Sequence, residues 1–94
     1  MAKSDNLNRL AYFVAVFETG SFTLAAERLG VGKSIVSRQI TQLERELGVV
    51  LLVRTTRKVA PSKAGQVFYM RCRKILALAD QAFAEMSRMK IALQ

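Results

Sequence analysis

The stretch from Gly20 to Gly65 constrains the fold more than any other part of this chain of 94 residues. It contains two short segments with helical periodicity, joined by a turn at Gly30, and then two runs rich in β-branched and aliphatic residues. Glycine permits the left-handed backbone with which many helices end. The order of these segments predicts a helix-turn-helix followed by a two-stranded hairpin, which is the winged helix-turn-helix architecture.

Three helices are expected to form the core, over residues 7–19, 23–29 and 33–47, because apolar residues recur there at intervals of three and four. Gly20 and Gly30 are expected to end the first two helices. The residues expected to face the core are Leu7, Leu10, Phe13, Val14, Phe17, Phe22, Ala26, Leu29, Val36, Ile40, Leu43 and Leu47.

The face of the third helix opposite its apolar stripe carries hydroxyl, amide and basic side chains. Its two acidic residues, Glu44 and Glu46, lie near the C-terminal end. An ordinary solvated face is the alternative, but such faces are usually richer in Glu and Lys. A helix with a polar, basic N-terminal half fits the major groove of DNA. Arg45 shares this face, and the residues that we select from it as candidates for DNA binding are Lys33, Ser34, Ser37, Arg38, Thr41 and Gln42.

Two β-prone runs, over residues 49–53 and 58–60, are expected to form the wing, with residues 54–57 at its tip. An isolated hairpin of this size is marginally stable, so the wing must pack against the helices.

Basic residues at the tip of the wing are further candidates for DNA binding. We expect Arg57 to enter the minor groove and Lys58 to contact phosphate. Two roles are open for Arg54: it could contact DNA, or it could form a structural ion pair with Glu44 or Glu46.

The start of the second helix is a third candidate contact. Ser21 and Thr23 can each cap this helix. They can also present hydroxyl and amide groups to a phosphate, aided by the helix dipole.

A fourth, long helix is expected after Pro61, capped by Ser62 and extending to about residue 90. It carries an apolar seam with alternating steps of four and three residues. We expect its first half to pack on the first helix and its second half to pack against another copy of the chain, giving a homodimer. This divides the chain into a winged helix over residues 1–61 and a dimerisation helix over residues 62–94. The seam residues are Phe68, Cys72, Ile75, Ala79, Ala82, Met86, Met89 and Leu93.

The net charge of +8 favours an acidic polymer as partner, although a solvated basic surface is the simpler alternative. Residues 31–60 and 61–94 each hold six basic and two acidic side chains, whereas residues 1–30 are neutral overall.

The chain has one Cys and no His, which excludes an internal disulfide and a Cys/His zinc site and leaves no catalytic set to name. No stretch approaches the length of a membrane span, and the apolar run in the first helix has helical spacing rather than a signal peptide's pattern.

Three segments together make the chain resemble the N-terminal domain of LysR-type transcriptional regulators. They read LNRLAYFVAVFETGSFTLAAERL, VSRQITQLERELG and LLVRTTRKVAPSKAG. The match covers nearly the whole chain in register. The resemblance places Ser37 and Arg38 at positions that contact DNA.

The chain departs from the family pattern at residues 32–35, which read Gly-Lys-Ser-Ile where the family often has Ser-Gln-Pro-Ala. Lys33 there would donate to guanine or to phosphate, and Gly32 would weaken the helix cap.

The resemblance implies a mainly α protein that binds double-stranded DNA at an interrupted inverted repeat as a dimer, or as a tetramer in the full-length protein. It also implies a C-terminal domain that binds a small-molecule effector, contact with RNA polymerase and a cytoplasmic location on the nucleoid. No cofactor is expected within these residues. Two alternatives stay open: a winged-helix repressor without a sensor domain, and a winged helix that binds an acidic protein.

Overall fold

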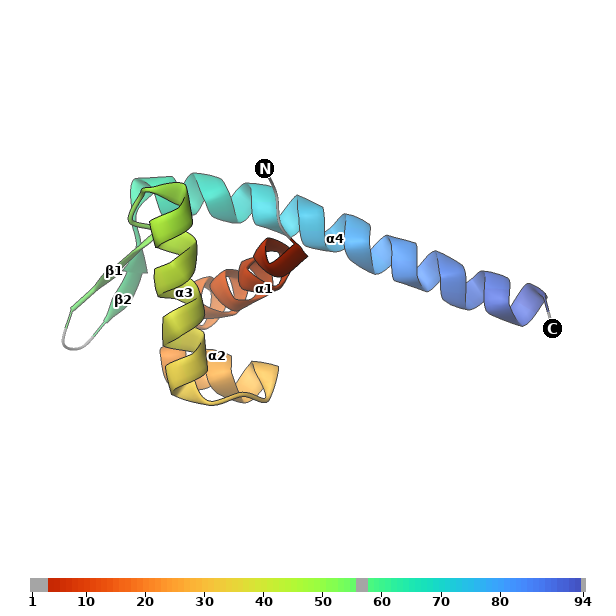
Figure 1. The fold of residues 1–94 in the computed structure, drawn as a ribbon, viewed down its shortest axis with the longest axis horizontal. Coiled ribbons are helices and arrows are strands. Elements are labelled where there is room, and N and C mark those ends of the chain that lie inside the picture. Colours follow the sequence, from red (N-terminus) through yellow and green to blue (C-terminus); the bar gives the residue numbers. More distant parts are fainter. Residues whose placement is uncertain (1–3, 56–57, 94) are drawn as a thin grey trace.

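The computed structural model describes residues 4–55 and 58–93 and contains a helix-turn-helix, a small wing and one long helix (Figure 1). Figure 1 shows the first three helices gathered beside the start of the long helix, whose far half extends away from them. This confirms the predicted winged helix-turn-helix with a long final helix. The elements are α1 (Ser4–Thr19), α2 (Phe22–Leu29), α3 (Lys33–Leu47), β1 (Leu52–Arg54), β2 (Val59–Pro61) and α4 (Lys63–Ala92).

The turn between α2 and α3 depends on Gly30. Its φ of 69° lies in the left-handed region, which residues with a side chain adopt at a cost. The Val31 N–H then donates to the Ala26 carbonyl at 3.1 Å, which closes the end of α2. At the other end of the turn, Gly32 precedes α3 and supplies no side-chain cap, as its replacement of the family's Ser predicts. The turn is therefore set by backbone geometry, with Val31 packed against the core.

The core lies where α1 packs against α2, α3 and the first part of α4. α1 is buried on more than one face, since Ala15 and Val16 are enclosed in addition to the predicted stripe. Two core predictions are wrong: Leu7 is 56% exposed and Leu47 is 44% exposed. Both occupy end turns of their helices, where the neighbouring elements no longer cover the apolar face. Phe22 and Leu29 are only half-buried, whereas Ala26 is fully buried as expected.

The wing is shorter than predicted because its first strand begins late. β1 pairs antiparallel with β2, with Leu52 opposite Pro61 and Arg54 opposite Val59. Before the strand, the Leu51 and Leu52 N–H groups both donate to the Glu44 carboxylate, at 2.8 and 3.0 Å. A side chain of α3 therefore satisfies the backbone N–H groups at the beginning of β1.

The start of α4 is fastened to the segment that precedes the wing. The Ser62 hydroxyl accepts a hydrogen bond from the Gly65 N–H at 2.9 Å, which confirms the predicted cap, and donates to the Val50 carbonyl at 2.6 Å. Gly65 is buried, and the helix passes so close to Leu51 that a β-carbon on Gly65 would overlap the Leu51 carbonyl oxygen. Only glycine permits this approach.

The predicted seam on α4 divides into a buried part and an exposed part. Cys72 is fully enclosed by the chain's own core, and the Phe68 ring lies 5.5 Å from that of Phe13. Cys72 is therefore unavailable to a second copy, which corrects its assignment as a dimer contact. Burial raises the pKa of its thiol to about 11, so it is protonated at neutral pH. The core thus continues beyond residue 61, the boundary between the two predicted units.

Beyond Leu76, the last residue of α4 that packs on the core, the described part of the helix is exposed. The exposed apolar side chains include Phe83 and Leu78, which the seam did not contain, besides Met86 and Met89. Within the described ranges, no helix has both the length and the apolar character needed to cross a membrane.

Candidate nucleic-acid interface

The three predicted groups of DNA-binding residues meet around one open hollow. The start of α2, the first turns of α3 and the wing each contribute to it, and it has a volume of about 390 Å³. Two basic side chains from the wing and one from α3 lie at its rim. The lining residues are Gly20, Ser21, Phe22, Lys33, Ser37, Arg54, Thr55, Lys58 and Val59.

Arg54 connects the three elements of this hollow. Its guanidinium lies 4.6 Å from the centre of the Phe22 ring, in the geometry of a cation–π contact. Its Nη1 donates to the Ser37 hydroxyl at 3.4 Å. The predicted alternative, an ion pair with Glu44 or Glu46, is wrong for the structure described. Arg54 therefore holds the wing against α2 and α3, and no carboxylate of the described residues pairs with it.

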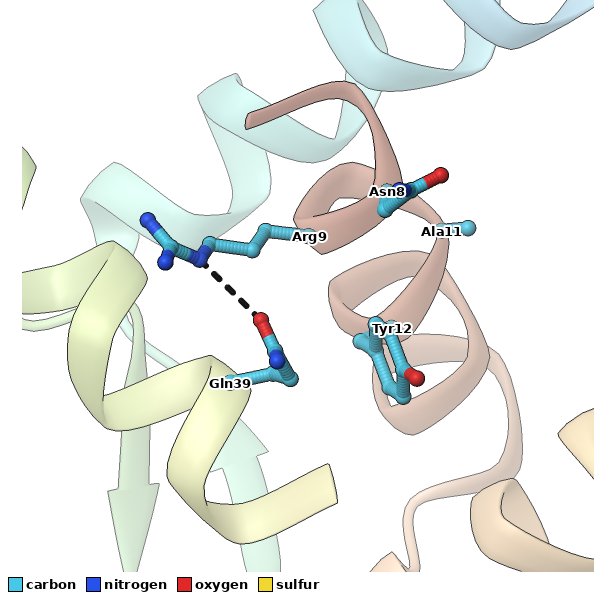
Figure 2. A pocket seen from close by; sticks show the side chains of 5 residues that line it. All are labelled: Asn8, Arg9, Ala11, Tyr12 and Gln39. Atoms are coloured by element: carbon cyan, nitrogen blue, oxygen red, sulfur yellow. Dashed lines mark hydrogen bonds between the residues drawn. The ribbon is translucent and has the colours of Figure 1, made fainter. Parts of the chain in front are cut away.

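Both acidic residues of α3 are engaged on sides of the helix away from the hollow. Glu44 accepts the two backbone hydrogen bonds that precede the wing, and Glu46 forms an ion pair with Arg9 of α1. The Arg9 Nε also donates to the Gln39 side-chain oxygen at 3.0 Å, as Figure 2 shows. The Arg9 contacts fix α3 against α1, and the engagement of Glu44 and Glu46 keeps both acids from offsetting the positive charge of the outer face.

A second hollow, of about 320 Å³, surrounds this Arg9 contact (Figure 2). Asn8, Ala11 and Tyr12 of α1 line it together with Arg9 and Gln39. Among the described lining residues Arg9 is the one basic side chain, and it is already bonded to Gln39 and Glu46. We therefore assign it a structural role.

Most candidates on α3 are exposed, namely Lys33, Ser34, Arg38 and Thr41, whereas Ser37 and Gln42 are partly buried. The steps from Ser34 to Arg38, Thr41 and Arg45 are four, three and four residues, so these side chains form one row along the helix. Arg45 is an addition to the selected candidates, and its helical spacing was the signal that could have identified it.

The candidates at the start of α2 have different surroundings. The Ser21 hydroxyl accepts a hydrogen bond from the Leu24 N–H at 3.1 Å, which confirms it as the cap, and Ser21 also lines the hollow. Thr23 is exposed but lies outside the lining. On the wing, Lys58 is exposed at the rim, and Arg57 lies outside the described residues.

These elements define the class of the protein: a winged helix-turn-helix domain with a basic, hydroxyl-rich outer face on its second motif helix. The family model for "bacterial regulatory helix-turn-helix protein, lysR family" matches residues 7–66. The chain therefore belongs to the LysR family of bacterial regulatory helix-turn-helix proteins, as the sequence motifs predict.

Curated relatives resemble almost the whole chain. An uncharacterized HTH-type transcriptional regulator of Haemophilus influenzae is 41% identical over 90 residues, which are 96% of this chain and 31% of that protein. The HTH-type transcriptional regulator PtxR of Pseudomonas aeruginosa is 44% identical over 80 residues, which are 85% of this chain and 26% of that protein. The chain thus spans about a quarter to a third of the length of these relatives.

Solved structures of similar domains have the same fold. The BenM DNA-binding domain in complex with catB site 1 DNA is 43% identical, with a TM-score of 0.84 over 88% of this chain and 93% of that one. The CbnR DNA-binding domain in a DNA complex is 39% identical, with a TM-score of 0.80 over 94% of this chain and 98% of that one. The fold is therefore that of the winged-helix DNA-binding domains of LysR-type regulators.

Proposed function

We propose that this chain is the sequence-specific double-stranded DNA-binding domain of a bacterial transcription regulator, and that it binds an inverted repeat as a homodimer. The observation that carries the proposal is that the exposed outer row of α3 and the hollow beside the wing hold basic side chains, while the acids of α3 are engaged elsewhere. The similar domains of BenM and CbnR, whose structures are DNA complexes, support it.

In this proposal the N-terminal half of α3 enters the major groove. Ser34 and Arg38 lie on its outermost row and read base edges or grip phosphate. Lys33 and Lys58 flank the hollow and are placed to contact the backbone on either side of the groove. Insertion of Arg57 into the minor groove remains a prediction.

The homodimer follows from the exposed half of α4. Side chains as large as Phe83 and Met86 are 77% and 56% exposed there, on a helix that has already left its own core. Large exposed apolar surfaces of this kind mark association sites. Pairing two copies through a two-fold axis would present two α3 helices to two half-sites of opposite orientation.

We further propose the roles that concern the longer protein. These are tetramer formation, contact with RNA polymerase, a small-molecule effector bound by a separate domain, and action at the nucleoid in the cytoplasm. The similar proteins are named transcriptional regulators, which supports a binding role for these residues rather than a catalytic one.

Replacing Arg38 by alanine is expected to weaken binding to the preferred DNA site by about 1–3 kcal/mol, and to relax preference at one base pair, if Arg38 contacts a base. Fluorescence anisotropy with the preferred duplex and with a scrambled duplex measures both effects. Arg88→Ala removes the same charge from an exposed position far along α4 and serves as the control.

Equal losses on the two duplexes would make Arg38 a phosphate contact. Unchanged binding to both would contradict the assignment of α3 as the DNA-reading helix.

A further inference from the structure

A cluster at the end of α1 joins three helices outside the proposed DNA surface. The Glu18 carboxylate accepts hydrogen bonds from Arg28 of α2 at 2.7 Å, from the Tyr69 hydroxyl of α4 at 2.6 Å and from Arg73 of α4 at 3.5 Å. We call these four residues the Glu18 cluster. None of them lines the hollow beside the wing, and the proposed contacts with DNA leave the cluster unexplained.

The geometry of the Glu18 cluster is fixed by more than charge. The Tyr69 ring stacks on Phe17, with ring centres 3.8 Å apart and planes 5° from parallel. The Tyr69 hydroxyl also accepts a hydrogen bond from Arg73 at 3.0 Å, so it donates to one side chain and accepts from another. This arrangement restrains both the position and the rotation of α4 relative to the end of α1.

The Glu18 carboxylate is charged at neutral pH. The hydrogen bond from Tyr69 is the largest cause that lowers its pKa, and Arg28 and Arg73 add to the effect, while partial burial opposes it. Because the pKa is lowered on folding, the cluster stabilises the protein above the ordinary carboxyl pKa. This stability is lost as the pH falls through the lowered value.

The cluster lies at the joint between the DNA-reading part and the dimerisation helix. α1 leads directly into α2, whereas α4 leaves the core within one turn of Arg73, since Leu76 is the last residue of α4 that packs there. From Arg73 to Ala92 the helix extends for about 28 Å at its usual rise per residue. A swing of about 10° at the joint would move its end by about 5 Å, which exceeds the rise of one base pair.

We propose that Glu18, Tyr69 and Arg73 are positioning residues that fix the angle between α4 and the helix-turn-helix, and so select the spacing of the two DNA half-sites. The inference rests on the proposed function, in which two copies joined through α4 read two half-sites. In such a dimer the angle of α4 sets the separation of the two α3 helices, and the half-site spacing follows from that separation.

The test compares two variants with two matched controls. Tyr69→Phe removes the hydroxyl and keeps the stacked ring, and Glu18→Gln removes the charge. Tyr12→Phe and Glu27→Gln make the same changes where the described residues show no hydrogen bond or ion pair of the side chain. Each protein is titrated with duplexes that carry the selected half-site alone, and with inverted repeats whose spacers differ by single base pairs.

The wild-type chain is expected to prefer one spacing. In Tyr69→Phe and Glu18→Gln, the affinity ratio between the best spacing and its neighbours should fall by about fivefold, as expected for one lost hydrogen bond. Binding to the single half-site should stay within about twofold, because the DNA-reading surface is intact. Both controls should keep the wild-type profile. The Glu18 pKa, followed by NMR, should rise in Tyr69→Phe and not in Tyr12→Phe.

An unchanged spacing profile in Tyr69→Phe, together with a raised Glu18 pKa, would overturn the inference. A wild-type chain that selects one half-site sequence and accepts all spacings would also overturn it, and would leave the proposed function intact. A wild-type chain that selects no sequence would overturn both.

Discussion

Replacing Gly65 by alanine is expected to lower the free energy of unfolding by about 3 kcal/mol, near the upper end for an overpacked core position. The added β-carbon would overlap the Leu51 carbonyl oxygen and lie 3.1 Å from the carbonyl carbon. A backbone carbonyl cannot turn away as a flexible side chain can, so either α4 or the segment before the wing must shift. Urea denaturation followed by circular dichroism measures the loss.

Gly32→Ala is the matched control. A β-carbon there would meet only the Ser34 hydroxyl at 4.0 Å, and the backbone of Gly32 is extended with φ of −75°. Alanine is a poorer N-cap than glycine but also restricts the unfolded chain, and because these two effects oppose each other the stability should stay within about 1 kcal/mol of the wild type. A Gly65→Ala protein that unfolds at the same urea concentration as Gly32→Ala would contradict the close packing of α4 on Leu51.

Replacing Met86 by glutamate is expected to abolish the homodimer and to lower affinity for an inverted repeat by about 100-fold or more, because the two half-sites are no longer bound by one linked unit. Met86 is 56% exposed on the part of α4 that has left the core, so the substitution leaves the fold of the single chain intact. A glutamate within a paired apolar seam would be desolvated without a partner. Analytical ultracentrifugation and anisotropy titration measure the two effects.

Ala84→Glu adds the same charge to the opposite side of α4 and should retain the dimer. If both variants remain dimeric, the seam on α4 is not the dimer contact. Two variants that both dissociate would show that the contact surface is broader than the seam and includes the exposed Leu78 and Phe83.

Local signals made the helix-turn-helix predictable. The capping hydroxyl of Ser21, the left-handed glycines at 30 and 48, and the apolar spacing of α3 each act within a few residues, so one sequence reveals them. The basic outer face of α3 follows from the same spacing, because the buried stripe defines its opposite side. The candidate DNA surface was therefore largely visible in the sequence.

Features that depend on neighbouring elements were not predictable in the same way. Periodicity assigned Leu7 and Leu47 to the core, but it does not say where the covering helices end. Nothing local shows that Glu44 binds the backbone before the wing, or that Arg54 stacks on Phe22 instead of pairing with an acid. Cys72 fits the spacing of the predicted dimer seam and yet lies inside the core. Spacing alone cannot separate the apolar residues of α4 that pack on the chain's own core from those that face a second copy.

The central claim is that this chain reads a DNA sequence as a two-fold dimer. Selection of sites from a random duplex library, with excess non-specific competitor at physiological salt, tests it most directly. The account predicts recovery of an interrupted inverted repeat. Binding that persists only at low salt, with no enriched sequence, would contradict it and would favour a winged helix whose basic face binds an acidic protein.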